Sequence, residues 1–170
     1  MKIRDLLWIL AYPIYQVIGT FRHEGAHALV AILSGGEVTK FVFWPSMLNG
    51  LFYWGYVMVV GPTGVLFSAA PYLLDLITYF FFFPLCMLVV FKRKWIWINL
   101  AVIGLISPFA NSLYNYRGGL SRLNDVGKMF QALPDGLVHG YFLFTLGIYL
   151  IGIVLVFGFS NTARNFREHK

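Results

Sequence analysis

The sequence predicts an all-α polytopic membrane protein with about four transmembrane helices and a short interfacial β-hairpin between the first two. Of its 170 residues, 59% are hydrophobic and only 12% are charged, a balance that is rare in soluble domains of this length. Apolar runs near or above twenty residues recur, and a helix of about twenty residues crosses a bilayer. No linker or low-complexity stretch divides the chain, so we expect one membrane-embedded domain over 1–170.

Four apolar segments account for the expected spans. We predict helices over roughly 5–33, 61–91, 95–115 and 136–159. Pro13 is expected to kink or interrupt the first helix, because proline removes a backbone hydrogen bond there. The Ser34-Gly35-Gly36 segment is expected to end that helix.

The connection 37–60 predicts a β-hairpin. It is rich in β-branched and aromatic residues, and Asn49-Gly50 in its middle is a strong signal for a two-residue turn. Tryptophan and tyrosine residues flank the turn, and these side chains favour the membrane–water interface. A short helix is the alternative interpretation of this segment.

The charges favour contact with lipid rather than with nucleic acid. The net charge is +6, but the basic residues lie mostly at the ends of apolar runs, as in Lys92-Arg93-Lys94 and the tail with Arg167 and Lys170. That placement suits contact with lipid headgroups. Cys86 is the only cysteine, which excludes an intramolecular disulfide and a thiolate zinc cluster. We therefore expect an integral, multi-pass protein of a bacterial or archaeal cell membrane.

The segment "HEGAH" places His23, Glu24 and His27 within an apolar helix. Histidines four residues apart lie on one helix face, so two imidazole nitrogens can reach one metal ion. Glu24 is offset by about 100° around the helix and can take a proton from water beside that ion. This is the chemistry of two zinc ligands and a general base. The alternative is a set of polar residues that face a bundle interior and hydrogen-bond to one another.

The third zinc ligand is expected to be an aspartate or a distant histidine. The other glutamates, Glu37 and Glu168, lie just past the first helix and in the basic tail. Asp125 is the first choice, because its connection lies on the side where His27 is about 9 Å from the helix end. His139, near the start of the last helix, and Asp75, about 21 Å into the second, are the alternatives. Asp125 could also be a loop or helix-capping aspartate.

Asparagines near the end of the third helix form a polar stripe. Ser107, Asn111 and Asn115 recur at a spacing of four residues, and Asn124 precedes Asp125. Asn111 and Asn124 are the candidates for orienting a ligand or binding a substrate peptide group. Hydrogen bonding between helices explains the stripe equally well.

Three stretches of the chain resemble the site-2 protease family of intramembrane zinc metalloproteases. "HEGAHALVAILSGGEV" resembles the family's first motif, "VVGPTGVLF" the Gly-Pro entry to its next helix, and "SRLNDVGKMFQALP" the segment that carries its aspartate ligand. The resemblance implies that His23, His27 and Asp125 bind zinc and that Glu24 is the base. The chain departs from the family's usual pattern at Asn124-Asp125-Val126-Gly127, which has no proline and has a valine before the glycine. It also has no recognisable PDZ or nucleotide-sensing domain.

The expected function is therefore zinc-dependent hydrolysis of peptide bonds in transmembrane or membrane-associated proteins. The main alternative is a catalytically inactive zinc-binding scaffold or pseudoprotease that holds membrane partners. A zinc or proton transporter is less favoured, because a transport pathway needs several ionisable clusters along its length and one is evident.

Overall fold

The structure, a computed structural model, describes the backbone of residues 3–121 and 124–168, and the side chains of 12–121 and 124–165. The chain forms two compact units, Met1–Pro71 and Tyr72–Lys170. That the two units form one membrane-embedded domain stays a prediction. The tail cations Arg167 and Lys170 lie outside the described side chains.

The first unit is built on one long helix, α1 (Ile3–Leu33), which confirms the predicted helix and contains Pro13 in its interior. Its end is set by glycine. Gly35 adopts a φ of 80°, which glycine reaches without steric cost. The backbone N–H of Gly36 donates to the carbonyl of Ala31 at 2.8 Å, and that of Gly35 to Ile32 at 3.0 Å. This is a Schellman motif, so the helix ends where the sequence predicted.

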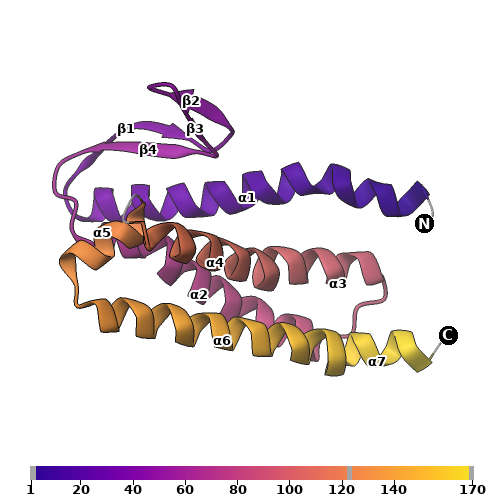
Figure 1. The fold of residues 1–170 in the computed structure, drawn as a ribbon. Helices are drawn as coiled ribbons and strands as arrows, with labels where there is room; N and C mark the ends of the chain where they lie inside the picture. The colour runs from indigo at the N-terminus through magenta and orange to yellow at the C-terminus, as the bar shows by residue number, and fades with distance from the viewer. Residues whose placement is uncertain (1–2, 122–123, 169–170) are drawn as a thin grey trace. The chain divides into compact units, whose positions relative to one another are not determined.

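The predicted hairpin is confirmed and consists of two consecutive ladders (Figure 1). Strands β1 (Glu37–Val42) and β4 (Tyr56–Val60) pair antiparallel, with a register shift between Val38 and Lys40. Strands β2 (Ser46–Leu48) and β3 (Leu51–Tyr53) pair beyond them. Asn49 and Gly50 close the turn with φ values of 51° and 79°, the signs that a type I′ turn requires.

The hairpin lies directly on α1. Phe21 of the helix meets the rings of Phe41 and Phe43 edge to face, with centroid separations of 5.7 and 5.4 Å. Gly55 permits a closer approach, because a Cβ atom there would lie 2.6 Å from the carbonyl oxygen of Val42 and 3.3 Å from Cγ of Glu24. The hairpin therefore covers the helix turn that carries the His-Glu motif.

The tip of the hairpin exposes large apolar side chains: Trp44, Met47, Leu51, Phe52 and Trp54. Such a patch is unusual on a surface that faces only water. It agrees with the expected position at the membrane interface, which stays a prediction.

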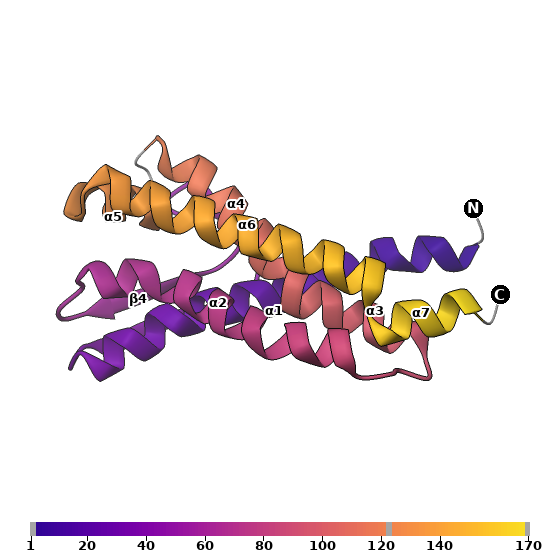
Figure 2. The ribbon, with the colours of Figure 1, turned by 90° about the horizontal axis from the view of Figure 1, so that it is seen from below.

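The second unit is helical. Its elements are the greater part of α2 (Val65–Leu88), then α3 (Lys94–Ala101), the π-helical turn η1 (Val102–Ile106), α4 (Ser107–Gly119), α5 (Asp125–Ala132), α6 (Asp135–Phe159) and α7 (Asn161–Glu168). The segments α3, η1 and α4 follow without a break and confirm the third predicted helix. The π turn precedes Pro108, which has no N–H for the regular ladder. Figure 2 shows the chain turning back between α5 and α6, and α7 beside the start of α3.

Aromatic packing and a few backbone hydrogen bonds hold the second unit together. Trp97 donates through Nε1 to the carbonyl of Cys86 at 3.1 Å, and the hydroxyl of Tyr79 donates to the carbonyl of Ile148 at 3.0 Å. Tyr79 also contacts the buried Tyr149, with ring centroids 4.9 Å apart. The polar tips of Trp97 and Tyr79 thus each have a carbonyl partner, as a low-dielectric interior favours.

Three helices of the described chain are long and apolar enough to cross a membrane: Val65–Leu88, Lys94–Gly119 and Asp135–Asn165. They match the second, third and fourth predicted spans. Among the described residues, α1 does not meet the same standard, although it has 31 residues. The reason is local, because Arg22, His23, Glu24 and His27 interrupt its apolar character.

Candidate metal centre

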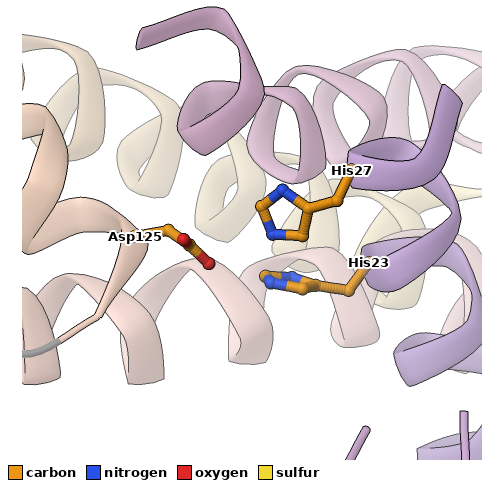
Figure 3. Close-up of side chains that lie close together, drawn as sticks. All are labelled: His23, His27 and Asp125. Carbon is orange, nitrogen blue, oxygen red and sulfur yellow. The ribbon is translucent and has the colours of Figure 1, made fainter. Parts of the chain in front are cut away.

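The two histidines of the first unit lie side by side on α1. The ring centroids of His23 and His27 are 5.1 Å apart, with an interplanar angle of 75°. Figure 3 shows both imidazoles projecting from the same side of the helix, one turn apart. The spacing of four residues therefore has the geometric consequence that the sequence predicted.

His27 is fixed by its surroundings. Its side chain is only 3% exposed, and its Nδ1 lies 2.8 Å from the backbone carbonyl oxygen of Phe67 in the first turn of α2. A carbonyl can only accept, so Nδ1 carries the hydrogen of this bond and Nε2 is the ring nitrogen left for a metal. The ring of Phe67 also contacts the imidazole, with centroids 4.5 Å apart. Metal-binding histidines in proteins are commonly oriented by such a bond.

Glu24 lies on the turn between the histidines and is partly buried. The hairpin residue Gly55 approaches its side-chain stem, as described above. On α1, Glu24 is offset by about 100° from His23, and its role as a general base stays a prediction.

Asp125 belongs to the second unit and is the first residue of α5. Asn124 caps this helix, and its side-chain oxygen accepts the N–H of Gly127 at 3.1 Å. The cap is thus Asn124, not Asp125 as one alternative had it. Lys128 donates to Oδ1 of Asp125 at 3.0 Å, and the aspartate side chain is 19% exposed. Figure 3 shows the carboxylate projecting from the start of the helix.

The two alternative third ligands have partners of their own in the second unit. Asp75 is 1% exposed, and its Oδ2 accepts the amide of Asn111 at 2.7 Å. Nδ1 of His139 lies 2.7 Å from the hydroxyl of Tyr116, and its ring contacts Phe130 at a centroid separation of 4.9 Å. Neither contact excludes a metal, so the choice among the three is made below as a proposal.

A cavity of about 810 Å³ opens on the second unit along α4. Its lining is apolar at Phe109 and Leu113 and polar at Asn115, Arg117 and Asn124. Asn124, which immediately precedes Asp125, is thus both a helix cap and a wall of this cavity.

Two contacts of the candidate site residues, His27 with Phe67 and Asp75 with Asn111, were not predicted from the sequence. The partner of His27 is a backbone carbonyl, which every residue possesses, so no residue type marks Phe67. The partner of Asp75 is Asn111. The asparagine spacing predicted a polar face on the third helix, and the sequence alone did not identify Asp75 of the second helix as its partner.

No protein family model, no curated protein and no solved structure matches this chain.

Proposed function

We propose that this protein is a membrane-embedded zinc metalloprotease of the site-2 protease type, acting on transmembrane or membrane-associated proteins. One observation carries the proposal: His23 and His27 lie on one side of α1, and the tautomer of His27 is set by the carbonyl of Phe67. Two imidazoles and a glutamate on neighbouring positions of one helix are the start of a hydrolytic zinc site.

Asp125 is the proposed third ligand. His23, His27 and Asp125 together offer two imidazole nitrogens and one carboxylate oxygen, a donor set that suits zinc and leaves one coordination position for water or substrate. The N-cap at Asn124 fixes the backbone on which Asp125 sits. The family resemblance points to the same residue, whereas Asp75 and His139 have no such support.

The proposed chemistry is hydrolysis of an amide bond. Bound zinc supplies Lewis acidity and lowers the pKa of water to about 7. Glu24 accepts the proton of the attacking water and delivers it to the leaving amine nitrogen. The hairpin over this turn of α1 restricts access of bulk water to Glu24, which favours proton transfer to the substrate.

We further propose that α1 also spans the membrane, in addition to the three candidate helices named above. Its 31 residues correspond to about 46 Å of helix at 1.5 Å per residue, which exceeds the roughly 30 Å of a bilayer core. Several large apolar side chains of α1 are exposed: Ile14, Ile18, Phe21, Leu29, Ile32 and Leu33. Ionisable residues in a span face protein or a water-filled cavity, so the His-Glu motif faces the interior of the protein.

Glu24→Gln tests the enzyme against the inactive scaffold. The variant should retain zinc and lose cleavage of a single-span reporter protein and of casein in detergent by at least roughly 100-fold, the loss expected for a general base. Glu37→Gln is the matched control, because Glu37 is exposed in β1, and it should cleave like the wild type.

A wild-type protein that binds zinc but cleaves nothing, with a Glu24→Gln variant that behaves identically in every assay, would support the scaffold. A wild-type protein that binds no zinc would overturn both readings.

A further inference from the structure

The second unit contains a chain of side-chain amides that starts at a buried carboxylate. Asp75 of α2 is 1% exposed, and its Oδ2 accepts Nδ2 of Asn111 at 2.7 Å. The Oδ1 of Asn111 accepts Nδ2 of Asn115 at 2.9 Å. Nδ2 of Asn124 donates to the backbone carbonyl of Asn115 at 2.8 Å, and it lies 3.4 Å from the side-chain Oδ1 of Asn115.

The chain ends at the first turn of α5. The Oδ1 of Asn124 accepts the backbone N–H of Gly127 at 3.1 Å. The two ends impose one direction on every link, because a carboxylate oxygen accepts whereas a backbone N–H can only donate. Asn111 and Asn124 therefore donate toward Asp75 and accept from the side of α5, whereas at Asn115 the shorter bond from Asn124 ends on the backbone carbonyl. Aligned hydrogen bonds of this kind polarise and strengthen one another in a low dielectric.

A carboxylate inside an apolar span is costly unless it has a structural or functional use. We propose that Asp75 is a positioning residue: through Asn111, Asn115 and Asn124 it holds the first turn of α5, and with it Asp125, in the geometry that metal binding requires. The part of this inference that concerns the metal rests on the proposed function. The part that concerns the order of α5 does not.

The test combines two readouts on the full-length protein in detergent. The first is hydrogen–deuterium exchange of the backbone amides of 126–128, and the second is zinc affinity measured by competition with a chelator. Asp75→Leu removes the acceptor at one end. Asn115→Ala removes the side-chain amide that donates to Asn111 and keeps the backbone carbonyl that accepts from Asn124, without touching the buried carboxylate. Ser112→Ala is the matched control, because Ser112 is 1% exposed on the same helix as Asn111 and outside the chain.

Asp75→Leu and Asn115→Ala should each speed exchange at 126–128 roughly fivefold, the effect of a weakened N-cap. Each should weaken zinc binding about 10- to 100-fold, as loss of a supporting partner does. Asp75→Asn retains an acceptor oxygen and should restore most of both. In the double variant Asp75→Leu/Asn124→Ala, the second change should add little, since both act through one connected chain.

Unchanged exchange at 126–128 in both Asp75→Leu and Asn115→Ala would overturn the inference, as would fully additive effects in the double variant. If Asp75→Leu does not fold, Asn115→Ala and Asp75→Asn still decide. A wild-type protein without zinc affinity would overturn the proposed function alone, because the exchange measurement needs no metal.

Discussion

Two polar clusters lie in apolar helices of this chain, and they are organised differently. In the first unit, His23 and His27 present ring nitrogens from one side of α1, and a backbone carbonyl orients His27. In the second unit, a series of hydrogen bonds runs from the Asp75 carboxylate through three asparagine residues to the cap of α5. The first arrangement brings two ring nitrogens to one side of a helix, whereas in the second the side-chain amides bond to one another and to the backbone.

Under the proposed function, this difference separates a metal-binding site from a structural network. Both clusters satisfy the rule that buried polar groups find partners, so burial alone does not tell them apart. Ligand chemistry does: two imidazoles with one tautomer fixed suit a borderline-soft cation, whereas asparagine amides suit one another. Variants in the first cluster should therefore remove metal binding, whereas variants in the second should change stability and the order of α5 and weaken metal binding only through that change.

The largest effect is expected from the histidines. His23→Ala and His27→Ala should each lower zinc content in purified protein from about one per chain to a few per cent, because two ligands hold a catalytic zinc far more weakly than three. Asp125→Ala should do the same. Metal analysis after dialysis without chelators measures this.

His139→Ala is the control for that series and should keep its zinc. Loss of zinc in His139→Ala with retention in Asp125→Ala would exchange the roles of these two residues in the proposed site.

The amide chain should respond in stability. Asn111→Leu leaves Oδ2 of Asp75 without its amide donor, and loss of a hydrogen bond to a charged group costs about 2–3 kcal/mol of unfolding free energy. Titration with a denaturing detergent measures the change. A loss below that of Ser112→Ala would show that the 2.7 Å bond between Asn111 and Asp75 contributes nothing.

The contact between the hairpin and α1 should give a smaller loss. Gly55→Ala places a Cβ atom 2.6 Å from the carbonyl oxygen of Val42, and relief of such overpacking costs about 1–3 kcal/mol. Gly136→Ala in α6 is the matched control, because its Cβ atom would meet open space. The same denaturing titration compares the two variants, and equal stability would contradict the close approach.

The smallest effect is expected from Lys128→Ala. Lys128 is 61% exposed, and its bond to Asp125 is an i,i+3 ion pair on α5. Such pairs are screened by solvent, so stability should change by no more than about 0.5 kcal/mol. Asn124→Ala, four residues earlier, should cost about 1 kcal/mol through the lost cap. A larger effect for Lys128→Ala would mean that the ion pair, not the cap, orders this turn.

The sequence predicted the long elements well because their signals are local. The ends of α1 and α6 were expected at 33 and 136–159 and are found at Leu33 and Asp135–Phe159. The Asn49-Gly50 turn was recognised because few residues accept positive φ at two successive positions. The pairing beyond the turn follows from the register that it sets.

The shorter elements and the partners in the site were harder to predict. The π turn η1, the eight-residue α5 and the terminal α7 are shorter than a window that periodicity can resolve. Asp75 was considered as a ligand, and nothing in the sequence paired it with Asn111, because contacts between helices depend on packing rather than on spacing within one helix.

Zinc-edge X-ray absorption of the purified protein tests the central claim most directly. One zinc per chain is expected, with nitrogen and oxygen ligands, no sulfur, and an imidazole scattering signature that is lost in both His23→Ala and His27→Ala. A metal-free wild-type protein, or a zinc spectrum that neither histidine variant alters, would contradict the assignment of this site.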